Sequence, residues 1–259
     1  MKKTTILLAA FAMSCLAGPA MSTESAHLLG ASSPTAFSGR TGAEKTLSKP
    51  ASENDAIFAV EVSERSDDPC FLKARYRDVV TGAEEGSLRF ARCSDNNDNE
   101  GNNSSRATVI LPDGSFVTGV RICLSSDRDK LKGIQLLGRV GGCLLGEESI
   151  PVSSSPCSGM VHLGGMEYTV CNETQPTFRE LGCEEPSATL SRFMERTNCK
   201  GSERGPDQDW ESEVSCPAGM VATGMRLSTR DSGGGRAMID GIALDCTRLT
   251  IGGSSGSRP

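Results

Sequence analysis

One unit recurs three times along the chain and constrains the fold more than any other feature. In its clearest copy, residues 213–248, Met225 and Leu227 alternate with polar residues, and Ile242 and Leu244 do so again after a glycine-rich segment. Alternation with a period of two is typical of strands that have one apolar face. This copy therefore predicts two antiparallel strands joined by a flexible loop.

Two fainter copies precede it, at about residues 107–140 and 155–184. In each copy, two glycines enclose four residues before the first strand: Gly114 and Gly119, Gly159 and Gly164, Gly219 and Gly224. Turns with positive φ, and corners where two chains approach closely, favour residues without a Cβ atom. A single such unit cannot bury its apolar face alone, so the three copies are expected to pack around a common axis. The sequence therefore predicts an all-β fold.

The third copy also carries a motif of aromatic, cysteine, glycine and acidic positions. Its residues are Trp210, Cys216, Pro217, Gly219, Gly224, Met225, Leu227, Asp240, Ile242, Leu244 and Cys246. This motif resembles the repeat of the vitelline membrane outer layer protein I family, most strongly over residues 210–248. The first copy departs from it, with Leu111 at the place of the cysteine, and residues 56–105 are extra. The resemblance implies an extracellular, disulfide-stabilised β-prism, in which three antiparallel sheets have pseudo-threefold repeats.

The N-terminal part has the composition of an export signal. Lys2 and Lys3 precede an apolar run and then small residues, which predicts a secretory signal peptide over residues 1–20 and, given its brevity, a bacterial source. A lipid anchor at Cys15 is the alternative. Residues 21–55 have no periodicity and are expected to form a disordered leader. A single domain is expected over residues 56–250, with a weakly helical stretch at 188–196, and a flexible tail over residues 251–259.

The cysteines favour disulfides over metal binding. Ten remain after removal of Cys15, no two have CxxC spacing, and an even count in an exported chain is typical of a disulfide framework. The expected pairs are Cys70–Cys93, Cys123–Cys143, Cys157–Cys183, Cys171–Cys199 and Cys216–Cys246, and other connectivities remain open. No metal site and no cofactor are predicted.

Charge restricts the partners. The chain has a formal net charge of −6, and loss of Lys2 and Lys3 with the signal makes it more acidic. An acidic protein is a poor match for nucleic acid or anionic membranes as main partners. No transmembrane segment is expected after removal of the signal, because no other apolar run approaches the length needed to span a bilayer.

Three stretches look like functional motifs and fail on inspection. Residues 230–235 resemble the nucleophile loop of trypsin-like proteases, but the only histidines are His27 and His162, and neither has a suitable context. Residues 252–256 fit G-x-S-x-G, but only three residues follow, too few for the required helix. In the polar loop 94–105 a calcium motif fails, since its glycine comes one position late and Arg106 replaces the bidentate glutamate.

The segment around the only tryptophan is the strongest candidate for a functional site. Its members are Trp210, Asp207, Asp209, Glu211 and Glu213. An indole face can stack on the C–H groups of a sugar while carboxylates accept hydrogen bonds from its hydroxyls. Paired carboxylates at a suitable separation can also hydrolyse a glycosidic bond. A solvated acidic loop with Trp210 packed on the core is the structural alternative.

These features predict an exported, non-catalytic binding protein that acts in the extracellular space or at the cell surface, with the periplasm as a further possible compartment. It is expected to be lectin-like and to recognise glycan or surface components. Two alternatives remain: a glycan-active enzyme that uses carboxylates near Trp210, and a secreted adhesin or effector that binds a host protein.

Overall fold

The computed structural model describes most of the chain outside its ends and four long internal stretches. The described residues are 23–50, 53–65, 68–93, 106–125, 128, 130–140, 159–163, 166–170, 187–190, 210–233 and 235–252. Nearly all of them lie in strands, as the all-β prediction requires. No helix within these ranges is long and apolar enough to cross a membrane.

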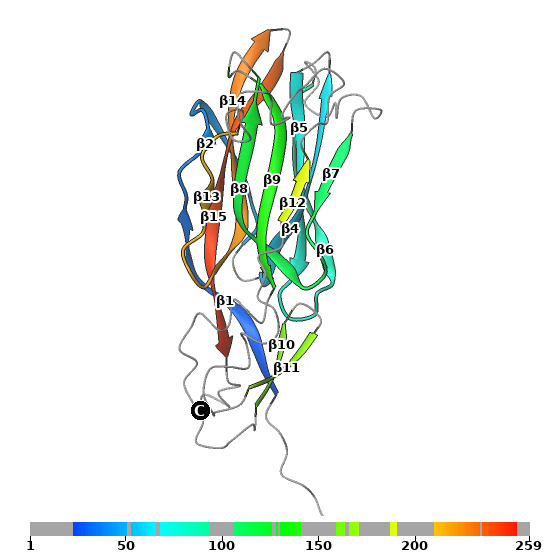
Figure 1. Cartoon of the computed structure of the whole chain (residues 1–259), viewed down its shortest axis with the longest axis vertical. Helices are drawn as coiled ribbons and strands as arrows, with labels where there is room; N and C mark the ends of the chain where they lie inside the picture. Colours follow the sequence, from blue (N-terminus) through cyan, green and yellow to red (C-terminus); the bar gives the residue numbers. More distant parts are fainter. Residues whose placement is uncertain are drawn as a thin grey trace, which may run out of the picture.

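The strands form three sheets, each built around one long hairpin (Figure 1). The first has the order β11(Met166–Val170), β10(Gly159–Leu163), β1(Thr23–Pro34), β15(Arg236–Gly252), β14(Met220–Gly233) and β3(Ala43–Ser48), with β2(Ser38–Gly39) also on β15. The second has the order β12(Ser187–Leu190), β9(Leu131–Val140), β8(Ser115–Leu124) and β13(Val214–Ser215). The third has the order β6(Glu84–Ala91), β5(Asp68–Asp78), β4(Asp55–Arg65) and β7(Ala107–Ile110). Neighbouring strands are antiparallel, apart from the parallel pair β1 and β10.

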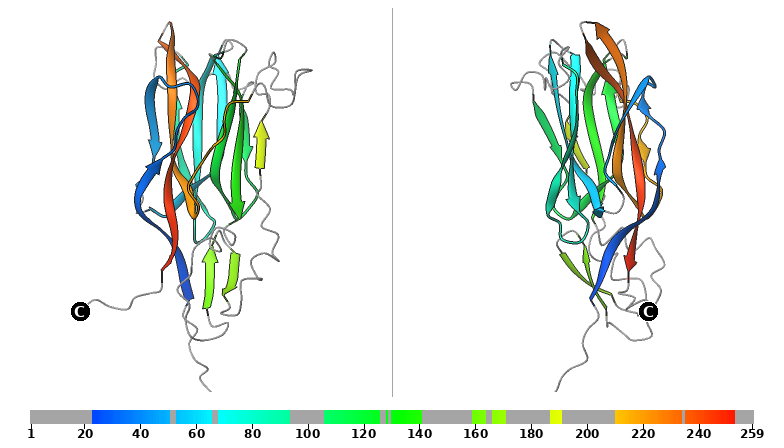
Figure 2. Two further views of the ribbon diagram at one scale, coloured as in Figure 1. Left: turned by 60° about the vertical axis from the view of Figure 1, so that its left-hand side comes forward. Right: turned by 180° about the vertical axis from the view of Figure 1, so that it is seen from behind.

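The three central hairpins, β4–β5, β8–β9 and β14–β15, run side by side around one core (Figures 1 and 2). Their first strands carry Val60, Val120 and Met225 at equivalent positions, all fully buried. The paired residues on the return strands are Ala74, Leu136 and Leu244, which belong to the same buried cluster. Full burial of a side chain of this kind contributes about 1.5–3 kcal/mol. Three antiparallel sheets around a shared core form the predicted β-prism.

The local geometry of the hairpins repeats as well. Asn54, Gly114 and Gly219 precede the three first strands, with φ of 51°, 72° and 73°. The carbonyl oxygen of Asn54 accepts a hydrogen bond from Val79 N at 2.8 Å, and Gly219 O accepts one from Leu249 N at 3.0 Å. The positive φ at this corner explains Gly114 and Gly219, because glycine adopts such a conformation without steric cost. Asparagine is among the few other residues that adopt it readily, which explains Asn54 at the same position of the third hairpin.

Each strand that precedes a central hairpin belongs to a neighbouring sheet. β3 precedes β4 but pairs with β14, β7 precedes β8 but pairs with β4, and β13 precedes β14 but pairs with β8. The exchange runs in a circle through all three sheets. Removing any one central hairpin together with the strand that precedes it therefore requires breaking backbone hydrogen bonds within a neighbouring sheet, which couples the three hairpins into one unit.

The predicted assignment of the second repeat is wrong. Residues 155–184 contain β10 and β11, which extend the β14–β15 sheet at one end of the molecule (Figure 2). The third central hairpin is instead β4–β5, from the region considered extra. This hairpin lacks both glycines of the predicted signature. Asn54 supplies the positive φ in place of the first glycine. Ala59 takes the place of the second, the residue after the β-bulge, which is Gly119 or Gly224 in the other hairpins.

The prediction of a disordered leader over residues 21–55 is also wrong. Residues from Thr23 onward form β1, β2, β3 and the start of β4. Edge strands are held mainly by backbone hydrogen bonds, so few apolar residues mark them. Ala26, Leu28 and Leu47 are the main apolar side chains that this segment buries. The helical reading of residues 188–196 fails where it can be checked, because Ser187–Leu190 is strand β12.

Two predicted disulfides are confirmed. Cys70–Cys93 and Cys216–Cys246 have S–S distances of 1.96 and 2.08 Å. Cys123 is also disulfide-bonded. The remaining cysteine predictions fall on Cys143, Cys157, Cys171, Cys183 and Cys199, which lie outside the described residues. The same is true of the signal at residues 1–20 and of residues 253–259.

Candidate functional site

The segment that begins at Trp210 lies along the edge of β8 and widens the β8–β9 sheet. Trp210 bridges to Cys123, Glu211 N donates to Ile122 O at 2.8 Å, and Val214 pairs with Val120. Val214 is the apolar residue that anchors the segment, because its side chain is buried against the core. Alternation then directs Glu213 and Ser215 outward, where both are exposed.

Trp210 is partly exposed and is held on the outer surface of the sheet. The guanidinium carbon of Arg121 lies 5.1 Å from the centroid of the indole ring. Arg121 Nε donates a hydrogen bond to Gln135 Oε1 on the adjacent strand. The cation over the ring fixes the orientation of Trp210 and contributes about 0.5–1 kcal/mol at such a surface site.

Glu211 forms a bidentate ion pair with Arg128. Arg128 Nε donates to its Oε1 at 3.1 Å, and an Arg128 terminal nitrogen donates to its Oε2 at 2.6 Å. The glutamate side chain is 17% exposed and the arginine 63%. Parallel hydrogen bonds of this kind orient both groups firmly. Glu211 therefore joins the Trp210 segment to the turn between β8 and β9.

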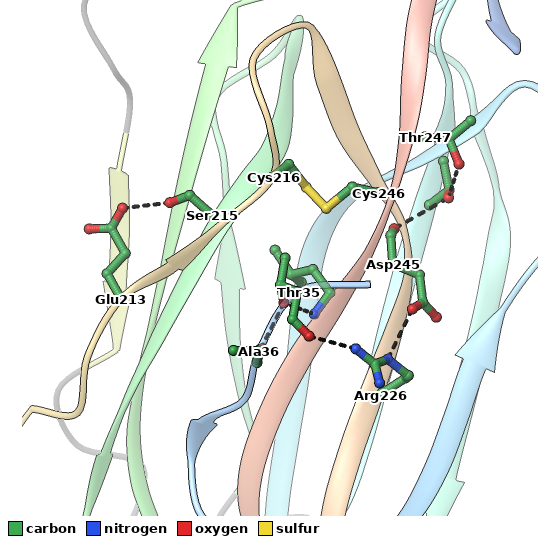
Figure 3. The surroundings of a disulfide bond; sticks show 11 residues. Thr35, Ala36, Glu213, Ser215, Cys216, Arg226, Asp245, Cys246 and Thr247 are labelled. Carbon is green, nitrogen blue, oxygen red and sulfur yellow. Dashed lines mark hydrogen bonds and ion pairs between the residues drawn. A yellow bond between two sulfur atoms is a disulfide. The ribbon is translucent and has the colours of Figure 1, made fainter. Parts of the chain in front are cut away.

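Glu213 borders a shallow pocket of about 150 Å³ on the same outer face. Ser215 Oγ donates to Glu213 Oε1 at 2.7 Å (Figure 3). The remaining wall and floor come from Thr118, Leu137, Gly138, Arg139, Cys216, Pro217, Ala218, Gly219 and Met220. The pocket thus presents a carboxylate, hydroxyls and a guanidinium around a small apolar floor.

The pocket depends on two special features of the repeat. The Cys216–Cys246 disulfide joins its rim to β15 (Figure 3). At the equivalent place in the preceding repeat, Leu111 packs on Gly138, where an added Cβ would lie 2.5 Å from Leu111 Cδ1. Gly138 is therefore required by packing, because the Leu111 side chain already fills the space that a side chain at this position would occupy.

The structure brings Trp210, Glu211 and Glu213 together along β8, as their spacing allows. Asp207 and Asp209 lie outside the described residues. The sequence reasoning missed Arg121 and Arg128, the cations that engage Trp210 and Glu211. One signal was available for Arg121: it follows Val120 as Arg226 follows Met225, so both arginines occupy the same outward position in their repeats.

The carboxylates and cysteines of the described ranges do not gather into a metal site. Within those ranges no group of three or more His, Cys, Asp or Glu side chains is arranged to hold an ion.

Comparisons with known proteins give weak likenesses only. No family model matches the sequence, and no curated protein matches it. Among solved structures, the Calystegia sepium lectin in complex with a bisected glycan has 10% identity and a TM-score of 0.39, over 84% of this chain and 98% of that one. A Malaysian banana lectin has 11% identity and a TM-score of 0.37, over 84% and 98%. The Vibrio cholerae biofilm matrix protein Bap1 has 8% identity and a TM-score of 0.35, over 86% of this chain and 24% of that one. TM-scores this low carry no conclusion about function.

Proposed function

We propose that the protein is an exported, non-catalytic carbohydrate-binding protein. Its glycan site would be the outer face of the β8–β9 sheet, from Trp210 to the pocket bordered by Glu213. The observation that carries the proposal is that one short segment along β8 carries both an indole held beneath Arg121 and the carboxylate that borders a polar pocket. Sugars combine apolar C–H faces with many hydroxyls, so they suit a surface of this kind.

Each group at the site has a role toward a sugar. Glu213 accepts hydrogen bonds from hydroxyls, and a hydrogen bond to a charged group contributes about 1.5–3 kcal/mol. Ser215 can accept a hydrogen bond, because its own proton goes to Glu213, whereas Thr118 can donate or accept and Arg139 donates. Leu137 and the indole edge of Trp210 offer apolar surface to C–H groups. The ligand class that fits is a neutral sugar with adjacent hydroxyl groups.

The site is preorganised, which limits the entropic cost of binding. Trp210 and Glu211 are fixed by Arg121 and Arg128, and the pocket rim is cross-linked at Cys216. Ordering a side chain on binding costs about 0.5–1.5 kcal/mol, which groups already held in place avoid. A shallow pocket with modest apolar area favours moderate affinity for each sugar unit.

The geometry favours binding over hydrolysis. A glycosidase needs a second carboxyl group free to donate or accept a proton at the scissile bond. Glu211, the described carboxylate nearest Trp210 in sequence, has both oxygens bound by Arg128. Export is supported by the disulfides, which persist in oxidising compartments.

A glycan array probed with the intact chain tests the proposal. We expect binding to neutral glycans, and a loss on the order of tenfold in Glu213→Gln, the size expected for one charge-assisted hydrogen bond. Trp210→Ala should weaken binding similarly. Glu85→Gln is the matched control, since Glu85 is exposed on β6 in another sheet.

Two results would contradict the proposal. Absence of binding to any neutral glycan by the folded wild-type chain would exclude the function. Equal affinities for wild type, Glu213→Gln and Trp210→Ala would move the site elsewhere. Release of shortened oligosaccharides from a bound glycan, lost in Glu211→Gln, would instead support the enzymatic alternative.

A further inference from the structure

The two features of the proposed glycan site, Trp210 and the pocket bordered by Glu213, lie at different places along β8. Trp210 is opposite Cys123, and Ser215, which lines the pocket, is opposite Gly119. Gly119 and Cys123 are four residues apart, and a strand rises about 3.3 Å per residue, so about 13 Å separates the two backbone positions. A single sugar ring is much shorter than this distance.

The size of the pocket limits how much of a ligand it can hold. Its volume is about 150 Å³. Sites that enclose a whole small-molecule ligand have volumes of about 300–1,000 Å³. The pocket therefore accommodates only a small part of a ligand, such as one sugar ring. Trp210 is not among the residues that line the pocket, so a ring seated there leaves the indole uncovered.

A row of side chains on the outer face of the sheet leads from the pocket to Trp210. Strand β9 places Arg139, Leu137 and Gln135 at alternate positions on this face, and all three are partly exposed. Arg139 and Leu137 line the pocket, whereas Gln135 lies beyond it, opposite Arg121. Arg121 in turn lies over the indole of Trp210. The outer face is therefore continuous between the two features.

The residues of this row offer further contacts to a sugar beyond the pocket. The hydrogen bond between Arg121 and Gln135 uses the amide oxygen of Gln135, and the amide nitrogen of the same side chain is a donor for hydroxyl groups. Arg121 takes part through Nε, and its terminal nitrogens carry further donors. Leu137 offers apolar surface to C–H groups at the edge of the pocket. The row therefore has the same mixed chemistry as the pocket.

We propose that this face binds an extended, β-1,4-linked neutral oligosaccharide that lies along β8, with one unit in the pocket and a later unit against Trp210. The inference rests on the proposed function of the same face and adds the length and shape of the ligand. An extended chain fits because the row follows a strand, whose backbone is itself extended. A monosaccharide would occupy the pocket alone.

The two contact regions predict that affinity depends on chain length. Once one unit is seated in the pocket, the linked units are held close to Trp210, and their contact becomes intramolecular. The second contact then adds affinity without a second loss of translational freedom. Affinity should therefore rise when the chain becomes long enough to reach Trp210 and stay constant for longer chains.

Calorimetric titration of the intact chain with β-1,4-linked sugars tests the proposal. The probes are the oligomers of glucose, mannose and xylose, each from the monosaccharide to the hexasaccharide. In at least one series we expect the hexasaccharide to bind on the order of tenfold or more tighter than the monosaccharide. Maltohexaose is the matched ligand for cellohexaose, because its α-1,4 linkages coil a chain of the same sugar. It should gain much less affinity over glucose.

Three variants locate the contact that depends on length. Trp210→Ala should remove the gain, so that the hexasaccharide binds little tighter than the monosaccharide, and Gln135→Ala should reduce it. Glu213→Gln should lower the affinity at every length and keep the gain, because this carboxylate borders the pocket. Glu85→Gln, on β6 of another sheet, is the control and should change neither quantity. Equal thermal midpoints would show that the variants fold.

The outcomes separate this inference from the proposed function. Affinity that is independent of length but falls in Glu213→Gln would overturn the extended ligand and leave carbohydrate binding in place. So would a full gain with length in Trp210→Ala, an equal gain with maltohexaose, or binding on the glycan array without binding in any of the three series. Absence of binding to every neutral glycan would overturn both proposals.

Discussion

At the scale of single residues, Tyr76 shows how the core accepts a polar group. Its side chain is fully buried, and its hydroxyl donates to Leu47 O at 3.0 Å. Burial raises the pKa of the Tyr76 phenol well above its usual range, and the negative charges of Asp245 and Asp55 raise it further. The phenol is thus kept protonated as a hydrogen-bond donor that attaches β3 to β5.

The raised pKa of Tyr76 predicts that the free energy of unfolding decreases at alkaline pH. An unfolded tyrosine ionises near its ordinary pKa of about 10, whereas native Tyr76 must stay protonated. The stability that this raised pKa supplies is complete below about pH 10 and declines as the pH rises from there toward the native pKa. Phenolate absorbance should therefore show Tyr76 ionising only as the chain unfolds in base.

Two comparisons check this assignment. Tyr76→Phe should remove the delayed ionisation and cost about 1 kcal/mol at neutral pH, because Leu47 O loses its donor. The chain in urea should titrate both of its tyrosines near the ordinary pKa. Ionisation of Tyr76 at its ordinary pKa in the folded protein would contradict the prediction.

At the scale of elements, the N-terminal strands are structural parts of the prism. β3 pairs with β14 over six residues, and β1 pairs with β15. Arg226 on β14 donates to Thr35 O at 2.7 Å and lies 3.0 Å from an Asp245 oxygen, which fixes the segment between β1 and β2 (Figure 3). Without β1 and β3, both long strands of the β14–β15 hairpin would have an open edge.

Truncated chains test whether residues 23–49 are structural strands or a disordered leader. A chain that begins at residue 23 should unfold at the same temperature as the intact chain. A chain that begins at residue 50 should lose several kcal/mol of stability or aggregate, because it exposes strand edges and removes Leu47 from the core. Urea unfolding and size-exclusion chromatography would measure both effects. Equal stability of the two truncated chains would restore the leader interpretation.

At the scale of the molecule, the tips of the three central hairpins meet at Asp68. One oxygen of this buried carboxylate lies 3.2 Å from Lys130 Nζ, and the other lies 3.3 Å from an Arg236 terminal nitrogen. Lys130 belongs to the turn before β9, and Arg236 begins β15. One side chain therefore links all three hairpins by charge at the end of the prism that carries their tips.

Asp68→Asn should test that link. We expect a loss of about 1–3 kcal/mol in unfolding free energy, between the values for exposed and fully buried ion pairs, because both cations are partly exposed. Asp113→Asn is the matched control: Asp113 pairs with Arg77, but its side chain is fully exposed. It should change stability by less than about 0.5 kcal/mol. Chemical denaturation would measure both, and equal effects would contradict a special role for Asp68.

The shared hydrophobic core predicts that a buried and an exposed isoleucine contribute very differently to the free energy of unfolding. Ile122 is fully buried in the shared core, whereas Ile110 on β7 is 48% exposed. Ile122→Ala should cost about 2–5 kcal/mol and Ile110→Ala about a tenth of that. Urea denaturation checks both values. A small effect at Ile122 would mean that the three sheets do not share a continuous core.

Several features could be predicted because they depend on residues close in sequence. Gly114 and Gly219 were found from their spacing, and both have the positive φ that the turn requires. Two disulfides were predicted. Cys70–Cys93 was expected to join two strands that are neighbours in sequence, and Cys216–Cys246 was predicted from the repeat pattern. Trp210, Glu211 and Glu213 were identified as a segment because they are nearly contiguous.

Other features depend on contacts between distant parts of the chain. Arg128 and Glu211 are separated by 83 residues, so nothing local marks them as an ion pair. The contact of Arg106 with the ring of Phe71 is another such case, because 35 residues separate the two side chains in the sequence. The β4–β5 hairpin was not recognised as one of the repeats, because Asn54 performs the role of a glycine.

Local periodicity and glycine spacing were thus sufficient to predict an all-β fold with repeated hairpins around a common axis, because backbone conformation and the alternation of apolar residues are properties of short segments. The β-prism itself was implied by the family resemblance. They did not decide which segments make the three faces, or that residues 23–48 complete a sheet. Strand pairing at an edge is a backbone interaction with little side-chain signature. Its partners are chosen only when the hairpins pack together, and the same packing assembles the pocket on which the proposed function depends.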